Sequence, residues 1–341
     1  MTVYTQQLRV ITGKLAHVSV TTATGTVVTY TSQSAHGYSV GDEVYIQGLS
    51  TAGHNGFKTI TAVPTTTTFR VNSTVTGTGA SAGLAVVNHQ YDLTVLDSVN
   101  ITGGRMDITS PVSPMTASVD IIADEAETFF SDNFNLNHAL VIQTYDDYTS
   151  AWTNLFIGQI TDINVLVNTW NVNGGTIRYS LQAASAMARL DYHSSAYSGA
   201  DALVNTGSVA SLWIAETLIK NPDFGSFMYW YGNVATDTVV MHKRANGTYT
   251  DSDICQTAAA SARGNLHDRP DGKLYYSTFA SSTAPSFYSL PRNSVTAYGL
   301  STRKSITDVY NKCFVTTTNT ALTTGSSSDT ASANAYGRRE G

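Results

Sequence analysis

Residues 34–71 read SAHGYSVGDEVYIQGLSTAGHNGFKTITAVPTTTTFRV, a stretch of short alternating segments separated by turn-forming residues. Apolar and polar side chains alternate at positions 42–47, 57–63 and 67–71, as they do in half-buried β-strands. Turn signals stand between these segments: His36-Gly37, Gly41-Asp42, Gly53-His54-Asn55-Gly56 and Val63-Pro64. Gly and Asn accept a positive φ and Pro presets a negative one, so each signal predicts a reversal of the chain. The stretch therefore indicates an all-β unit.

The same pattern extends to both sides and defines a unit over residues 15–88. Positions 26–31 and 83–87 add two strands, and Asp42, Glu43, Lys58 and Arg70 are its only Asp, Glu, Lys or Arg residues. Five short strands predict a small barrel or sandwich. Residues 1–14 contain a further strand at 3–11, and we expect it to pair with material after residue 89, because an insertion enters and leaves at neighbouring points.

Strand patterns continue at 91–95, 98–101, 115–122, 139–145, 151–167 and 175–184. Loop signals at 145–148 and 173–175 predict antiparallel hairpins. The fold class is therefore mainly β: antiparallel barrel or sandwich domains with a few short helices and an inserted small β-domain. We expect residues 1–14 plus 89–190 to form the first β-domain, 15–88 the inserted unit, and 191–341 a second domain.

The second domain is predicted to contain two helices, a β-hairpin and C-terminal strands. Apolar residues from Val209 to Ile219 recur at helical spacing behind Ser208, a candidate N-cap. A second helix is expected at 253–263, with Ser252 or Asp251 as cap and Gly264 at the C′ position. Residues 266–276 form two short strands around Pro270-Asp271-Gly272, in which Gly takes the left-handed position.

Composition excludes several classes of function. Of 341 residues 13% are charged, and the net charge is −6 with a sequence pI of 5.7, so no long-range positive field attracts nucleic acid. No apolar run approaches the about 20 residues that span a bilayer, and the first residues lack the apolar core of a signal peptide, so the mature chain is expected to be the translated one. Cys255 and Cys313 are expected to be unpaired thiols.

Few residues suggest chemistry. His267-Asp268, with Asp251 to Asp253 upstream, could form an acid–base pair or a Ca²⁺ site, but adjacent strand residues face opposite sides and the aspartates are better explained by helix capping. An acidic group suits glycoside cleavage, yet a solvated loop explains it better: Asp124, Glu125 and Glu127. We expect no enzyme activity and no catalytic, cofactor-binding or metal-binding residues.

Two aromatic features have structural and functional interpretations. His36 is best explained by a ring packed at the edge of the small β-unit. The run Phe227-Met228-Tyr229-Trp230-Tyr231 is favoured as core, with a subunit contact as the alternative, because an outward aromatic face would be an interface hot spot.

The stretch 34–71 resembles a small β-module that recurs as an insertion in bacteriophage tail and baseplate proteins. The matching landmarks are His36-Gly37, Val40-Gly41-Asp42, Val44, Gly48, Asn55-Gly56, residues 59–63 and Thr68-Phe69. Other segments resemble, in order, the minor tail proteins that form the tail-tip hub of long-tailed siphophages. They are residues 98–105, 117–121, 155–163 (LFIGQITDI), 181–190, the hairpin with Asp268 and Asp271-Gly272, 305–315, 329–332 and 336–338.

The resemblance implies a structural subunit of the virion tail tip, made in the bacterial cytoplasm. It would form a hub ring at the distal end of the tail tube, as a homotrimer, for host adsorption and DNA passage. Implied partners are distal tail or tail-tube proteins, the tape measure protein, and tail fibre or receptor-binding proteins. Hub proteins usually continue beyond the Tyr-Gly-Arg segment at 336–338, so we expect a shorter variant or a last domain supplied by another chain.

One alternative is a tail-tip adsorption protein that binds cell-wall carbohydrate through residues 15–88. That function needs aromatic platforms, and the unit contains Tyr30, Tyr38, Tyr45, Phe57 and Phe69, of which all but Tyr38 lie in strand patterns. A wall hydrolase is the third and least favoured hypothesis.

Overall fold

The computed structural model describes residues 7–78, 83–92, 96–104, 113–124, 134–146, 150–167, 176–224, 229–278, 312–315 and 325–328. They belong to two compact units, Met1–Ala284 and Pro285–Gly341. The fold is mainly β with antiparallel sheets and a closed barrel, which confirms the predicted class. In the second unit, β19 (Lys312–Val315) and β20 (Gly325–Ser328) pair antiparallel, and the resembling segments at 305–311, 329–332 and 336–338 lie outside the described residues.

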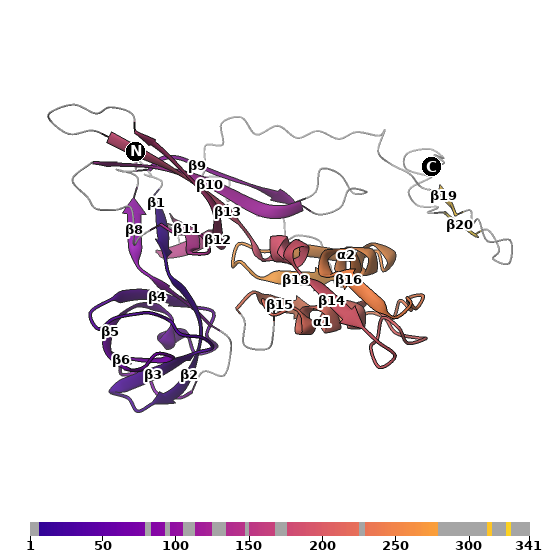
Figure 1. The fold of residues 1–341 in the computed structure, drawn as a ribbon, viewed down its shortest axis with the longest axis horizontal. Helices are drawn as coiled ribbons and strands as arrows, with labels where there is room; N and C mark the ends of the chain where they lie inside the picture. Colours follow the sequence, from indigo (N-terminus) through magenta and orange to yellow (C-terminus); the bar gives the residue numbers. More distant parts are fainter. Residues whose placement is uncertain are drawn as a thin grey trace. The chain divides into compact units, whose positions relative to one another are not determined.

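The barrel has the strand order β2-β3-β6-β5-β4-β7 (Figure 1). Its strands are β2 (Leu15–Ala23), β3 (Val27–Ser32), β4 (Glu43–Gln47), β5 (Gly56–Thr65), β6 (Thr68–Asn72) and β7 (Gly83–Val87), with a 3₁₀ turn, η1, at Ala52–His54. Six strands close it, so the expectation of five was wrong. The missed strand is β2, whose sequence follows β1 without a turn signal and whose pairing with β3 and β7 closes the ring.

A seven-stranded antiparallel sheet has the order β8-β1-β11-β12-β13-β10-β9. Its strands are β1 (Leu8–Gly13), β8 (His89–Asp92), β9 (Leu96–Gly104), β10 (Ser113–Asp124), β11 (Ala139–Asp146), β12 (Ala151–Val167) and β13 (Thr176–Ala184). β1 pairs with β8, with Thr12 opposite His89, which confirms the expected pairing of the first strand with the chain that follows the barrel.

The chain after β13 forms short elements against one face of this sheet. They are η2 (Ala186–Tyr192), β14 (Ser194–Tyr197), α1 (Ala210–Lys220), β15 (Tyr231–Val234), β16 (Gly247–Thr250), α2 (Asp251–Ser261), β17 (Asn265–Asp268) and β18 (Leu274–Ser277). β14 pairs with β16, β17 and β18 form the predicted hairpin, and β15 joins β18 in parallel. Gly272 has a φ of 79°, as the Pro-Asp-Gly turn required.

Both helices lie where they were predicted, but their caps differ. The N-cap of α1 is Val209 rather than Ser208, and the Asp237 carboxylate accepts the Ser211 N–H at 2.9 Å. The N-cap of α2 is Thr250, so neither Ser252 nor Asp251 is the cap.

The end of α2 also differs from the prediction. Arg263, not Gly264, takes the left-handed position with a φ of 53°. Gly264 N–H donates to the Ala259 carbonyl at 2.8 Å and Arg263 N–H to that of Ala260 at 3.0 Å, the two bonds of a Schellman cap. The helix therefore ends one position earlier than Gly264 at C′ would require.

The central strands of the sheet are buried on both faces. Ile11, Val141 and Ile157 face a core shared with the helices, while Val10 and Phe156 face a second core. This explains why their sequences are continuous apolar runs rather than alternating ones.

The barrel shares the first of these cores. Its own interior is filled by side chains such as Tyr30 and Phe69, which stack at 5.0 Å. However, Leu84 and Val86 of β7 belong to the core that also holds Trp230. The barrel is therefore packed against the rest of its unit through an apolar contact.

A chain of side-chain hydrogen bonds reinforces this contact. Gln143 of β11 donates to the Tyr45 hydroxyl at 2.8 Å, and Tyr45 donates to Gln47 at 3.1 Å. Gln47 donates to the Tyr229 hydroxyl at 2.8 Å, and Tyr229 donates to the Asp271 carbonyl at 2.7 Å. These hydrogen bonds connect the sheet, the barrel and the hairpin.

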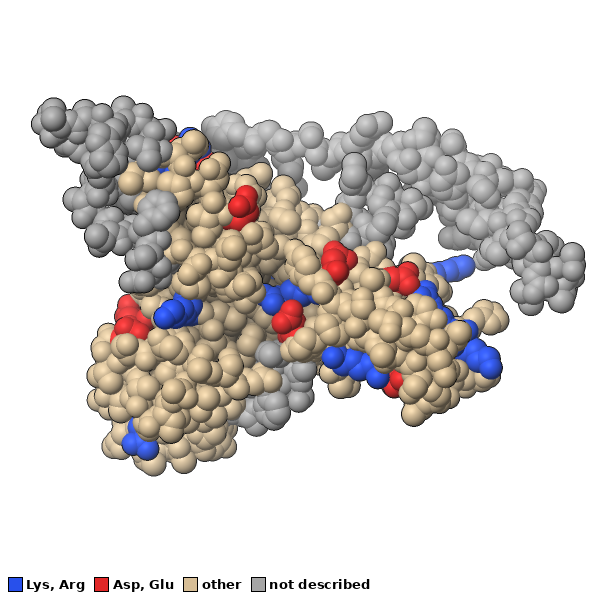
Figure 2. All heavy atoms as spheres, in the orientation of Figure 1, with Lys and Arg blue, Asp and Glu red and all other residues tan. Residues whose placement is uncertain are grey.

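Charge is sparse on the surface. Among the described atoms visible in Figure 2, Lys, Arg, Asp and Glu side chains are scattered between broad areas of other residues. Within the described ranges, no helix combines the length and apolar character needed to cross a membrane.

Candidate functional site

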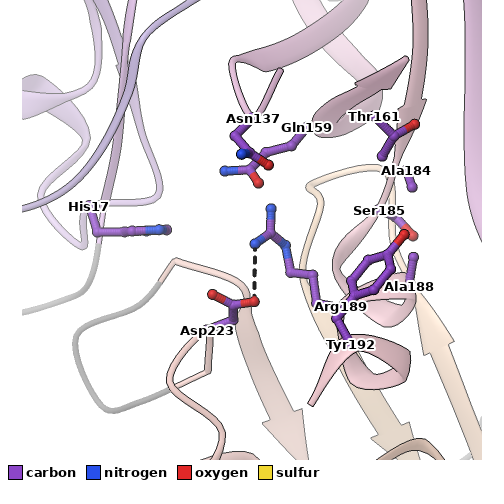
Figure 3. A pocket seen from close by; sticks show the side chains of 10 residues that line it. All are labelled: His17, Asn137, Gln159, Thr161, Ala184, Ser185, Ala188, Arg189, Tyr192 and Asp223. Atoms are coloured by element: carbon purple, nitrogen blue, oxygen red, sulfur yellow. Dashed lines mark ion pairs between the residues drawn. The ribbon is translucent and has the colours of Figure 1, made fainter. Parts of the chain in front are cut away.

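A polar cleft of about 360 Å³ lies where barrel, sheet and helical elements meet (Figure 3). His17 comes from β2 and Asp223 from the segment after α1. The remaining lining residues belong to the sheet strands, the segment before β11, and η2: Asn137, Gln159, Thr161, Ala184, Ser185, Ala188, Arg189 and Tyr192.

Arg189 of η2 provides the positive charge of the cleft. Its guanidinium lies over the Trp230 ring, 4.5 Å from the ring centroid, and forms an ion pair with Asp223 at 3.4 Å. Only 12% of its side chain is exposed, and its buried Nε has no hydrogen-bond partner within the described part of the chain. Burial lowers the pKa of Arg189, while Asp223 opposes that shift. Arginine stays protonated in proteins, so a cation is held here with few acceptors.

His17 faces Arg189 from the barrel side. Its Nδ1 accepts the Tyr229 N–H at 3.0 Å, and its ring meets Trp230 edge-on at 5.8 Å. Burial, and then the charge of Arg189, lower the pKa of His17 to about 4. The ring is therefore neutral at pH 7. Because Nδ1 is an acceptor, the proton is on Nε2, and the ring points toward the guanidinium in Figure 3.

Two carboxamides and a phenol complete the polar lining. Asn137 and Gln159 direct their amides toward Arg189 (Figure 3), and Asn137 holds a φ of 67° just before β11. Tyr192 is 76% exposed beside the cleft. The cleft thus offers N–H donors from several directions and suits a ligand rich in acceptor oxygens.

His267 and Asp268, which the sequence analysis did not favour as an acid–base pair, make separate contacts. The Asp268 carboxylate accepts the Ser185 hydroxyl, and it accepts the Met115 and Met187 N–H groups at 3.2 and 2.9 Å. His267 stacks instead on Tyr275, with ring centroids 6.1 Å apart. Burial raises the pKa of Asp268 and lowers that of His267. Asp268 is therefore a clamp between segments.

The aspartates at the start of α2 serve two separate contacts. Asp251 is fully buried and accepts from Asn221 at 2.8 Å, and it lies 2.8 Å from His193 Nδ1. Asp253 pairs with Arg244 at 2.5 Å. Among the described residues, no group of three or more His, Cys, Asp or Glu side chains could hold a metal ion.

The remaining sequence candidates are mostly structural or undescribed. Glu125 and Glu127 lie outside the described residues, and only the backbone of Asp124 is described, at the end of β10. The His36 ring is buried and packs on Tyr38 and Phe69, at 4.8 and 5.5 Å. Cys255 is a buried free thiol, whose pKa burial raises.

Most of the aromatic residues that the sequence analysis singled out, and that the structure describes, have buried side chains. Tyr229 and Trp230 are 2% and 0% exposed, which agrees with the core interpretation, while Phe227 and Met228 lie outside the described residues. In the barrel, Tyr30, Tyr38 and Phe69 are buried, including the one tyrosine outside the strand patterns. They offer no stacking platform for a carbohydrate.

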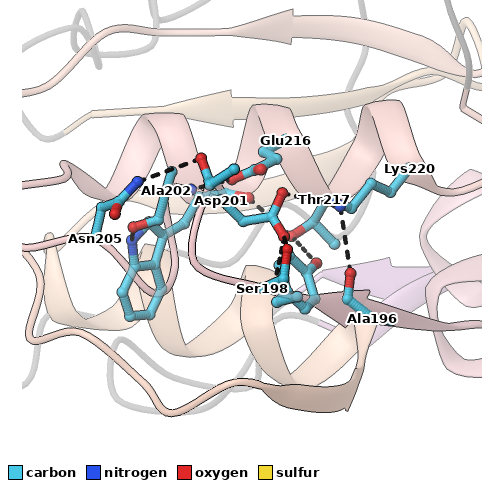
Figure 4. Close-up of polar contacts among 11 residues, drawn as sticks. Ala196, Ser198, Asp201, Ala202, Asn205, Glu216, Thr217 and Lys220 are labelled. Atoms are coloured by element: carbon cyan, nitrogen blue, oxygen red, sulfur yellow. Dashed lines mark hydrogen bonds and ion pairs between the residues drawn. The ribbon is translucent and has the colours of Figure 1, made fainter.

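The sequence did not reveal a pair of carboxylates formed by Asp201, in the loop before α1, and Glu216 of α1 (Figure 4). Asp201 forms an ion pair with Lys220 at 3.0 Å and accepts the Ser198 N–H at 2.6 Å, while Glu216 accepts the Ala202 N–H at 2.7 Å. The Ser198 bond and Glu216 lower the pKa of Asp201 to about 2, and burial followed by Asp201 raises that of Glu216. These bonds fix the loop before α1.

The Arg189 cleft was also missed. Its residues come from positions between 17 and 223, and no short motif joins them. The one available signal was a single Arg in the otherwise uncharged stretch Ala186–Leu190.

Among known proteins, the similarities of this chain are to solved structures. No protein-family model and no curated protein matches the chain. Among solved structures, the chain is similar to the crystal structure of the 43 kDa tail protein of prophage MuSo2 from Shewanella oneidensis, with 13% identity and a TM-score of 0.39. The match covers 71% of this chain and 66% of that one.

Proposed function

We propose that this chain is a non-enzymatic structural subunit of a bacteriophage tail, located in the hub ring at the distal end of the tail tube. The observation that supports the proposal is a convergence in the fold. Within the first unit, the resembling segments 155–163 and 181–190 and the hairpin with Asp268 and Gly272 are up to about 110 residues apart in sequence, yet they meet at one junction. The resembling residues therefore include those that connect the hairpin to the sheet.

Asp268 and Gly272 bring the hairpin into this junction. The Asp268 carboxylate accepts hydrogen bonds from Ser185, at the exit of β13, and from Met115 of β10. Gly272 lies so close to β12 that a Cβ at this position would be 2.7 Å from Ile157 Cβ. The hairpin is therefore fitted to the strand that carries the Phe-x-Gly-x-Ile pattern.

Glycines make the other contacts of the junction. A Cβ on Gly158 of β12 would lie 2.4 Å from the Ala184 carbonyl oxygen, and one on Gly103 of β9 would lie 2.8 Å from Met115 Cα. Gly158 permits a close approach to the resembling segment 181–190, and Gly103 permits a close approach to β10, two residues before the segment 117–121. These close contacts hold the sheet strands and the hairpin together, as a structural subunit requires.

The proposed partners follow from the resemblance. They are two further copies of the chain in a homotrimeric ring, distal tail or tail-tube proteins, the tape measure protein, and tail fibre or receptor-binding proteins. A surface with few charges favours such packing, because burying it requires little charge desolvation.

Particle composition tests the proposal. Quantitative mass spectrometry of purified phage particles should give three copies of this chain per tail, counted against the tail-tube subunit. Gold-labelled antibody should mark the tail end distal to the head. Six copies or one copy per tail, or label along the tube, would exclude the hub ring.

A further inference from the structure

We infer that the Arg189 cleft binds a sugar that carries a carboxylate. The inference stands on the cleft alone and does not depend on the proposed tail function. In the barrel, the rings of Tyr30, Tyr38 and Phe69 are buried, and the partly buried Tyr45 and Phe57 pack against the shared core.

The cation in the cleft has unused capacity for an anion. A guanidinium has five N–H donors. Within the described residues, Arg189 forms an ion pair with Asp223 at 3.4 Å, longer than the about 2.7–2.9 Å of a charge-assisted hydrogen bond. Asp223 is itself 43% exposed, so water weakens its attraction for the guanidinium. Stacking on Trp230 holds the guanidinium in place without satisfying its donors.

His17 makes an anionic ligand more favourable. Its neutral ring carries the proton on Nε2 and points toward the guanidinium (Figure 3). Two donors that face one another are stabilised by an acceptor placed between them. A carboxylate has two oxygens and can accept from both.

The rest of the lining fits a sugar ring better than a bare anion. Carboxamides such as Asn137 and Gln159 both donate and accept, as pairing with hydroxyl groups requires. Tyr192 presents an aromatic face that is 76% exposed beside the cleft, where the apolar face of a sugar can pack. A volume of about 360 Å³ is at the lower end of ordinary small-ligand sites and suits one monosaccharide.

The test compares two sugars that differ by the carboxylate. Methyl β-D-glucuronide and methyl β-D-glucoside are titrated into the full chain at pH 7, with binding followed by calorimetry or saturation-transfer NMR. The glucuronide should bind at least tenfold more tightly, and acetate should compete only weakly. Equal binding of both sugars, binding of neither, or acetate as effective as the glucuronide would overturn the inference.

Variants locate the binding. Arg189→Gln should weaken glucuronide binding at least tenfold, while Arg244→Gln, a change at an arginine outside the cleft, should leave it unchanged. Arg189 packs on Trp230, so two substitutions that spare the fold are also needed. Gln159→Glu adds a repelling carboxylate of the same shape, and Tyr192→Ala removes the exposed ring. Each should weaken binding at least threefold, and unchanged affinity in both would exclude this cleft.

Discussion

Asp268→Ala tests whether the junction of resembling segments holds the first unit together. The substitution removes an acceptor from the Ser185 hydroxyl and from the Met115 and Met187 N–H groups. A buried donor left without a partner costs about 1–3 kcal/mol, and the hydroxyl can turn elsewhere, so two backbone donors remain. Loss of the buried charge offsets part of that cost. We expect a loss of about 2–4 kcal/mol in the free energy of unfolding at pH 7.

The pH dependence of this loss has a definite sign. Burial raises the pKa of Asp268 above its ordinary value of 3.8, so the folded chain binds this proton more tightly than the unfolded chain. Stability contributed by Asp268 is therefore full below about pH 3.8 and declines as pH rises through the raised pKa. The deficit of Asp268→Ala should be larger at pH 4 than at pH 7.

Guanidinium chloride unfolding, followed by tryptophan fluorescence, measures both effects. His267→Ala is the matched control, because it lies on the same strand and loses a ring contact with Tyr275, worth about 1 kcal/mol, and a 3.3 Å contact between Nδ1 and the Asn265 carbonyl, but no contact to another segment such as Ser185. Equal losses for the two variants would refute the clamp, and a deficit of Asp268→Ala that grows toward pH 7 would refute the raised pKa of Asp268.

Three further predictions concern stability. Glu216→Gln should raise Tm at pH 7, because burial and the neighbouring Asp201 raise the pKa of Glu216 and so disfavour its charged form. Thermal unfolding scans should show that this gain vanishes near pH 4, where the native Glu216 is protonated. Gly48→Ala should cost at least about 2 kcal/mol more than Gly41→Ala in chemical unfolding: both have positive φ, but only at Gly48 would a Cβ lie 2.3 Å from the Tyr229 ring. Replacing residues 16–88 by a short Gly linker should lower Tm and increase binding of a hydrophobic dye, because the barrel covers part of the shared core. An unchanged Tm would show that the rest of the unit does not need the barrel for its stability.

Local pattern was sufficient for most of the fold. Alternation and turn residues predicted the barrel strands and the Pro-Asp-Gly hairpin, because a side chain's face and a turn's φ depend on neighbours in sequence. β2 escaped because it follows β1 directly, and only its pairing with β7 makes it a barrel strand.

Features set by distant residues could not be predicted. Asp251 looked like a cap, but it is recruited by His193 and Asn221, which lie 58 and 30 positions away. The residues of the Arg189 cleft also come from distant positions in the sequence. Burial, and then the charge of Arg189, lower the pKa of His17, and Arg189 lies 172 positions further along the chain, a separation that no sequence periodicity reveals.

The point at which the barrel joins the sheet has an evolutionary consequence. Thr12 pairs with His89, and Val87 N–H donates to the Lys14 carbonyl at 3.1 Å, so the two ends of the barrel are adjacent. In topological terms the barrel takes the place of a hairpin turn between β1 and β8. Its replacement by a tight turn would preserve the register of the sheet. A lineage could therefore gain, lose or exchange this domain while the sheet kept its pairing. Loss of the barrel would expose the surface around Tyr229, so selection would act mainly on the residues of that surface.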